Sequence, residues 1–136
     1  MSERLRSAAG TDRRRRAERG GRRAEALAVW LLRLKGYRIV AQRMRTPVGE
    51  IDIVARRGSV LALVEVKHRP DPESGMEAVT PRQQKRIRSA ARWFLAARPE
   101  FAAFCLRFDV ILSWRGWHLR HIPAAFAPDH DTIGLP

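Results

Sequence analysis

G-E-I-D-I-V-A at residues 49–55 and V-L-A-L-V-E-V-K at residues 60–67 are two short apolar runs, each interrupted by charged residues. Runs of this length and composition, separated by Arg57-Gly58-Ser59, predict two strands joined by a hairpin turn. Charged side chains are rarely placed in the centre of a sheet without a partner or a function. The two runs therefore indicate both the core of the fold and a candidate functional site.

Side chains alternate between the two faces of a strand, so the spacing of the charges predicts where they point. Glu50 and Asp52 share one face in the first run, and Glu65 and Lys67 share one face in the second. The opposite face of the first run carries Ile51, Ile53 and Ala55. A two-residue loop at residues 57–58 pairs position 52 with 63 and 50 with 65, whereas a four-residue loop pairs 52 with 65. Both loops bring the four charges to one face, and a three-residue loop without a bulge separates them.

The remaining pattern completes an α/β domain. A helix over about 22–35 ends at Gly36, and a second helix over about 81–97 begins with Thr80 as N-cap, Pro81 at the first position and Gln83 completing a capping box. Strands are predicted over 37–41, 104–112 and 116–122, and residues 42–48 are a connection or an edge. The order αβββαββ leads from the third strand through a helix to the fourth, so we expect a mixed central sheet flanked by helices.

The chain is long enough for one domain, and its charge is strongly positive. Its 136 residues divide into an expected flexible basic arm over 1–20, a folded domain over 21–122 and a C-terminal tail over 123–136. The net charge is +13, and the chain beyond the basic N-terminal segment is itself positive. Because arginine suits phosphate recognition, this balance favours a nucleic-acid partner over a merely solvated basic surface.

Composition also excludes several classes of protein. With 45% hydrophobic residues the chain is globular rather than disordered. It has no apolar stretch near the ~20 residues that cross a bilayer, and no secretory signal. Cys105 is the only cysteine, which excludes an internal disulfide and a cysteine-based zinc site. We therefore expect a cytoplasmic protein without a membrane partner.

Asp52 and Glu65 are hard oxygen ligands of the kind that hold Mg²⁺ or Mn²⁺. The backbone carbonyl of Val66 is a further candidate ligand, and Lys67 is placed to orient a water molecule or to stabilise charge on a phosphate. Glu25 joins the site only if its helix packs beside this face, and its position alone slightly favours a helix-dipole role. The alternative is an ion pair of Lys67 with Glu65 or Asp52 on a solvated face.

Other residues carry weaker signals. Alternation points His68 to the opposite face, and it places His118 and His121 on opposite faces, which makes them a poor metal pair. Asp109 is better explained by a structural salt bridge than by catalysis. The four tryptophans at positions 30, 93, 114 and 117 are better explained by core or edge packing than by base stacking. The candidate nucleic-acid-binding residues are Arg69, Arg82, Lys85 and Arg86.

Several ordered motifs resemble those of the YraN-like family of small bacterial proteins. These motifs are G-R-R-A-E at 21–25, G-Y-R-I-V at 36–40, V-G-E-I-D at 48–52, V-E-V-K at 64–67 and R-F-D-V at 107–110, so the resemblance covers about residues 20–126. That family is similar to the restriction-endonuclease-like, or PD-(D/E)xK, nuclease superfamily, and within it to archaeal Holliday-junction resolvases. Two positions depart from the pattern: Ile51 stands where the superfamily name has proline, and Arg43 where the family's asparagine is expected.

The resemblance implies a Mg²⁺- or Mn²⁺-dependent endonuclease that hydrolyses phosphodiesters in structured or branched DNA. It implies metal-ligand roles for Asp52, Glu65 and Glu25, a catalytic role for Lys67 and an auxiliary role for the acid Glu50. Branch-cutting relatives work as dimers, so a homodimer is an expected assembly. Two other functions stay open: a non-catalytic nucleic-acid-binding protein that keeps the nuclease fold, and an interaction subunit whose acidic face pairs with a basic partner.

Overall fold

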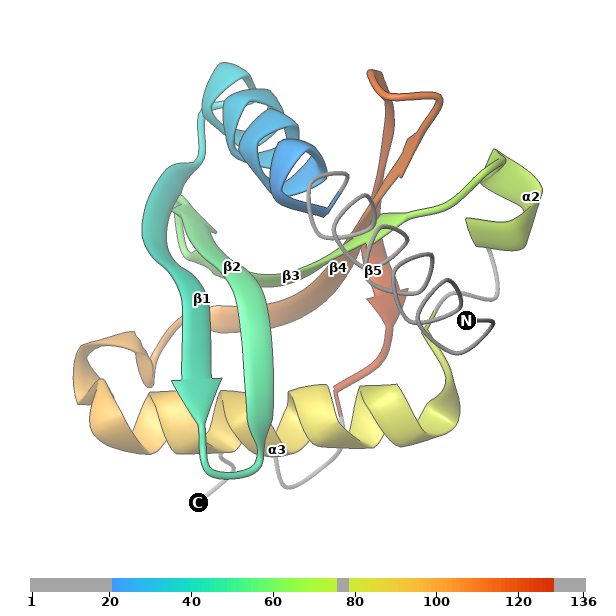
Figure 1. Ribbon diagram of the computed structural model, residues 1–136. Coiled ribbons are helices and arrows are strands. Elements are labelled where there is room, and N and C mark those ends of the chain that lie inside the picture. The colour runs from blue at the N-terminus through green and yellow to red at the C-terminus, as the bar shows by residue number, and fades with distance from the viewer. Residues whose placement is uncertain (1–20, 76–78, 129–136) are drawn as a thin grey trace, which may run out of the picture.

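The two charged apolar runs form the central hairpin of the sheet, β2 (Gly49–Arg57) and β3 (Val60–His68). The computed structural model describes residues 21–75 and 79–128, so the predicted basic arm and residues 129–136 lie outside it. In the described part, one sheet has the strand order β1-β2-β3-β4-β5 (Figure 1). β1 (Arg38–Thr46) pairs antiparallel with β2, β4 (Cys105–Trp114) parallel with β3, and β5 (His118–Phe126) antiparallel with β4. The predicted mixed sheet and the order αβββαββ are confirmed.

A helix covers each face of this sheet. The first helix, residues 21–34, precedes Gly36, whose φ of +89° is the left-handed conformation typical of a helix C-cap. On the other face lies α3 (Pro81–Ala97), and its predicted capping box is present: Gln83 N donates to Thr80 Oγ1 (3.2 Å) and Thr80 N donates to Gln83 Oε1 (3.1 Å). A short α2 (Pro72–Gly75) and a 3₁₀ turn (Pro99–Phe101) complete the helices of the described part.

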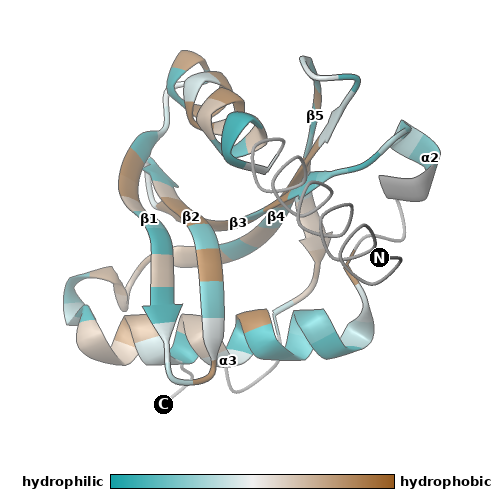
Figure 2. Ribbon diagram, in the orientation of Figure 1, coloured by the Kyte–Doolittle hydropathy of each residue, from teal (hydrophilic) through white to brown (hydrophobic). Residues whose placement is uncertain are grey.

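The core is divided between the two faces, which we call the first-helix face and the α3 face. Val64 and Ile111 pack with the first helix, while Leu63 and Phe108 pack with α3. The central strands carry the most apolar residues, and the N-terminal turns of α3 are the most hydrophilic part of that helix (Figure 2). None of the helices in the described part is long and apolar enough to cross a membrane.

Three strands extend beyond their predicted bounds. β1 continues through residues 42–46 and turns into β2 at Pro47 and Val48, so this segment is an edge strand and not a connection. β4 runs on to Trp114, and β5 begins at His118 and continues past Pro123 to Phe126. The added part of β1 is polar and that of β5 includes Pro123, and both are edge strands, which tolerate such residues. Composition alone therefore did not predict these strand segments, which form because their backbones pair with β2 and β4.

The β2–β3 loop has two residues, as predicted, but it lies one residue further along the chain. Arg57 pairs with Val60, and Gly58 takes the first loop position with a φ of +58°, where a two-residue hairpin turn requires glycine. The predicted loop at residues 57–58 is therefore wrong by one position. Continued towards the site, the observed register sets Asp52 opposite Glu65, the pairing that the sequence had assigned to a four-residue loop.

Candidate active site

β2 and β3 part near one end of their hairpin, and the candidate residues lie where they part. The last pair in this ladder is Ile53 with Val64, so Asp52 and Glu65 come directly after it. In place of the next main-chain bond, Asp52 Oδ2 accepts a 2.8 Å hydrogen bond from the backbone N–H of Val66. The Asp52 carboxylate thus replaces the β2 main chain as the hydrogen-bond partner of β3. We call this point, where the two strands separate, the fork.

β2 also twists sharply at Asp52. Residues two apart on a strand normally share a face, yet Ile51 packs on the α3 face and Ile53 packs on the first-helix face. The predicted common face of Ile51 and Ile53 is therefore wrong. On β1, Arg43 lies between the partners of Ile53 and Ile51 and has a φ of +49°, a conformation uncommon for residues other than glycine. The distortion of both strands directs the Asp52 carboxylate towards β3 at the fork.

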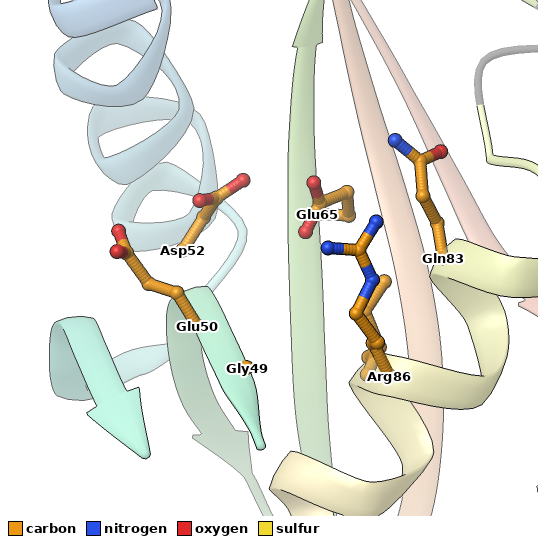
Figure 3. A pocket seen from close by; sticks show the side chains of 7 residues that line it. Gly49, Glu50, Asp52, Glu65, Gln83 and Arg86 are labelled. Carbon is orange, nitrogen blue, oxygen red and sulfur yellow. The ribbon is translucent and has the colours of Figure 1, made fainter. Parts of the chain in front are cut away.

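A pocket of about 200 Å³ opens on the α3 face at this fork. In Figure 3 the carboxylates of Asp52 and Glu65 extend into the space between β2 and β3, and the Arg86 side chain reaches the same space from α3. The lining residues are Gly49, Glu50, Asp52, Glu65, Gln83, Arg86 and Ile87. The structure therefore brings together three of the predicted acids and one of the predicted basic residues.

The two central carboxylates are held at raised pKa values. Burial raises the pKa of Asp52 to about 7, helped by the charges of Glu65 and Glu25 and opposed by the hydrogen bond from Val66 and the charge of Lys67. Burial also raises the pKa of Glu65, although Lys67 counteracts it. One ammonium group does not balance the negative charge that these carboxylates carry when ionised. A positive charge placed beside the pair would therefore favour the ionised form of both carboxylates.

Lys67 is paired but not solvated. Its Nζ lies 3.2 Å from Glu65 Oε1, and the Lys67 and Glu65 side chains are only 14% and 16% exposed. The predicted alternative was an ion pair on a solvated face. Its pairing of Lys67 with Glu65 is confirmed, but its placement of that pair in solvent is wrong. An ammonium group that is largely shielded from solvent acts on its neighbours more strongly than one in water.

Glu25 and Glu50 lie further out. Glu25 Oε2 accepts a 2.6 Å hydrogen bond from Arg43 Nε, so in this structure Glu25 holds the distorted part of β1. Its charge still raises the pKa of Asp52, which places Glu25 within electrostatic reach of the pair. Glu50, with its side chain 44% exposed, lies 3.7 Å from Arg45 at the rim of the pocket. The metal-ligand role of Glu25 and the auxiliary role of Glu50 stay predictions.

The donor set suits a magnesium ion with substrate. Among the described residues no group of three or more His, Cys, Asp or Glu side chains is arranged to hold a metal ion. Mg²⁺, however, is commonly held by one or two carboxylates, with water and substrate phosphate completing its coordination, and Asp52 and Glu65 supply two. The N–H and C=O of a strand residue point to the same edge, so the Val66 carbonyl faces the fork as its N–H does. These three groups fit Mg²⁺ or Mn²⁺.

The candidate phosphate-binding residues surround the pocket unequally. Arg86 lines it, and Arg82 and Lys85 are exposed on the first turns of α3. Arg69 follows β3, where its N–H donates to Ser113 O and its Nη1 donates to His68 O. Gln83 was predicted only as a capping residue, yet it lines the pocket. Its spacing of three from Arg86 and four from Ile87 on one helix was the signal that could have identified it.

Asp109 belongs to a separate structural cluster on the first-helix face. It is fully buried and accepts hydrogen bonds from Arg107 Nε (2.8 Å), from Arg107 Nη2 (2.8 Å) and from the Ala124 N–H (3.0 Å), and His121 Nε2 lies 2.8 Å away. Burial alone would raise the pKa of Asp109, but the bonds with His121 and Arg107 lower it to about 2. The predicted structural salt bridge is confirmed. His68 contacts Ser113 Oγ (3.2 Å), away from the pocket as predicted.

Comparison with known proteins places the chain in a family that has no assigned reaction. Residues 24–112 match the uncharacterised protein family UPF0102. The chain belongs to UPF0102. Relatives named only as UPF0102 proteins come from Parvibaculum lavamentivorans (55% identical over 113 residues, 82% of this chain and 84% of the relative), Rhodopseudomonas palustris (56% over 110 residues, 81% and 82%) and Bartonella tribocorum (48% over 111 residues, 80% and 84%). The predicted membership of the YraN-like family is confirmed in these terms. The matched region contains every residue of the pocket and Lys67.

Proposed function

We propose that this chain is a metal-dependent endonuclease that hydrolyses phosphodiester bonds in structured or branched DNA. The observation that carries the proposal is the Asp52–Glu65 pair, two half-buried carboxylates of raised pKa beside Lys67. Burying two like charges together opposes folding. Binding of a divalent cation and a phosphate would offset this unfavourable free energy, which gives the placement of the two carboxylates a function.

Each residue has a role that follows from its place in the pocket. Asp52, Glu65 and the Val66 carbonyl would hold Mg²⁺ or Mn²⁺, which supplies polarisation of a phosphoryl oxygen and a lowered pKa of bound water. Lys67 donates hydrogen bonds towards the attacking water or the phosphate. Arg86 binds a phosphate oxygen from the opposite wall. Overall, water forms one P–O bond, the ester P–O bond breaks, and a proton from water ends on the leaving oxygen.

The charge distribution supports a nucleic acid as the substrate class. The net charge is +13, and the exposed Arg82 and Lys85 lie on the helix that forms one wall of the pocket. Basic residues beside a phosphate-sized pocket neutralise the backbone on either side of a scissile bond. The resemblance to Holliday-junction resolvases favours branched DNA and a homodimer that meets both strands of a junction.

The test is cleavage of a labelled four-way junction, with duplex and single-stranded DNA and RNA as further substrates, in Mg²⁺ or Mn²⁺. We expect Lys67→Met and Asp52→Asn to lower the cleavage rate by about 100-fold or more, with junction binding in EDTA retained. Glu100→Gln changes an exposed acid outside the pocket and should keep full activity. A native protein that binds these nucleic acids but cuts none of them in either metal contradicts the proposal.

A second candidate, a nucleic-acid-binding protein without catalysis, is favoured by the 2.6 Å bond between Arg43 and Glu25. Because of that bond, Glu25, the third predicted metal ligand, is occupied away from the Asp52–Glu65 pair. In this case affinity for DNA falls steeply with salt because phosphate contacts carry it. Asp52→Asn would then leave both affinity and salt dependence unchanged, and Mn²⁺ would not alter the stability of the native protein.

A further inference from the structure

Three aromatic rings form a stack at the turn between β4 and β5. The His118 ring lies 4.1 Å from the Trp117 ring and 5.3 Å from the Trp114 ring, measured between centroids, with interplanar angles of 25° and 23°. The Arg120 guanidinium lies over Trp114, 6.0 Å from its centroid. Trp117 is 72% exposed, so the stack ends in a flat aromatic surface open to solvent.

The backbone fixes this stack in place. Trp114 and His118 are cross-strand partners that close the loop of residues 115–117. The Nδ1 of His118 is buried and has no hydrogen-bond partner within the described part of the chain, so ring packing holds the imidazole. The sequence interpretation as core or edge packing suits the partly buried Trp114, whereas Trp117 is largely exposed and stacks on His118. A large exposed ring at this turn, backed by two further rings, offers a flat surface on which a ligand can stack.

The stack lies on the same face of the sheet as the pocket. Lys67 pairs with Leu112, and paired residues share a face. Trp114 is two residues beyond Leu112, so its side chain lies on that face too, about 7 Å further along the strand. Val79, next to the N-terminus of α3, packs against the same small cluster as Trp114. The face that carries Glu65 and Lys67 on β3 therefore continues along β4 to Trp114 at the aromatic turn.

The charge of this hairpin matches a phosphate chain. Arg115 and Arg120 are exposed, and residues 110–128 contain no Asp or Glu. A flat ring beside arginine side chains is the usual arrangement for a nucleotide whose base is unpaired, because the base stacks and the phosphate meets the cation. Bases inside a duplex have both faces covered by their neighbours. The surface therefore favours a single-stranded segment over a continuous duplex.

We infer that Trp117, backed by His118 and Trp114, is a stacking platform for an unpaired base of a nucleic acid whose strand continues over the α3 face towards the Asp52–Glu65 pocket. This inference rests on the proposed function and narrows it: the substrate carries a single-stranded segment beside the scissile bond. Stacking on aromatic rings tolerates every base, so recognition at the platform depends on strand structure rather than on sequence.

The test is binding of a fluorescein-labelled oligothymidylate of about 15 nucleotides, with a duplex of equal length as the second probe, measured by anisotropy in EDTA. Trp117→Ala should weaken oligothymidylate binding by about 5- to 100-fold and leave duplex binding and melting temperature unchanged. Trp117→Phe should keep most of the affinity, because a ring remains. Trp30→Ala is the matched control, since Trp30 is 63% exposed on the first helix.

The platform would be overturned by an absence of oligothymidylate binding in the native protein, by native affinity in Trp117→Ala, or by an equal loss for both probes. A loss in Trp30→Ala as large as in Trp117→Ala would also overturn it. Because EDTA removes divalent metal, this assay is independent of cleavage. Trp117-dependent binding by a protein that cuts nothing supports the platform and rejects the proposed endonuclease, so the two failures are distinguishable.

Discussion

Replacing Asp52 by asparagine should stabilise the metal-free protein at alkaline pH. Asparagine keeps an oxygen that accepts the hydrogen bond from Val66 but removes the charge. The pKa of Asp52 rises from an ordinary 3.8 to about 7 in the fold. The folded state therefore binds a proton that the unfolded chain has already lost between these values. The stabilising effect of that proton is complete below pH 3.8 and is lost as the pH rises through about 7.

The magnitude follows from the size of this shift. One pKa unit corresponds to about 1.4 kcal/mol, so a shift of roughly three units sets an upper limit of about 4 kcal/mol. Glu65 titrates together with Asp52 and shares the effect. We therefore expect Asp52→Asn to raise the free energy of unfolding by about 2 kcal/mol near pH 8 and by about 1 kcal/mol or less near pH 5.

The assay is urea unfolding in EDTA at both pH values, followed by circular dichroism. Asp109→Asn is the matched control, because the pKa of Asp109 is lowered to about 2 and its charge is fully paired. That variant should lose about 3 kcal/mol at neutral pH, since Arg107 would be left without its partner. An Asp52→Asn protein that is no more stable than native near pH 8, or equally stabilised at both pH values, would refute the reasoning.

Two further predictions concern the metal. Mn²⁺ should raise the melting temperature of the native protein, because a ligand that binds only the folded state stabilises it. It should not raise the melting temperature of Glu65→Gln. Equal shifts of the two proteins in differential scanning calorimetry would exclude Glu65 as a metal ligand. Arg43→Asn should keep the fold, because asparagine tolerates a φ of +49°. The variant should also bind Mn²⁺ more tightly, because Glu25 loses its hydrogen-bond partner and is free to approach the metal. Unchanged Mn²⁺ affinity in calorimetric titration would show that Glu25 does not reach the metal.

The sequence predicted best where neighbours along the chain decide the structure. Thr80 and Gln83 cap α3 as expected, and Gly36 follows the first helix as expected, because capping depends on a few adjacent residues. The αβββαββ order followed from such local signals. It also led to the mixed sheet, since a helix between β3 and β4 favours parallel pairing.

Alternation was less reliable where tertiary contacts override it. The four charges were predicted to converge on one face, and Glu50, Asp52 and Glu65 do line one pocket with Lys67 paired to Glu65. The fork, however, could not be derived from spacing, because it depends on the bond from Val66 to Asp52 across two strands. For the same reason the face of Ile51 was predicted wrongly.

At the fork, a backbone N–H group is in direct contact with the charge of Asp52. Strand N–H groups normally donate to neutral carbonyls, whereas the Val66 N–H donates to a carboxylate that changes charge near neutrality. The electron density around this one amide proton must follow the ionisation of Asp52 and the arrival of any cation there. The resonance of a single main-chain proton is therefore a built-in indicator of the state of the site, readable without substrate or label.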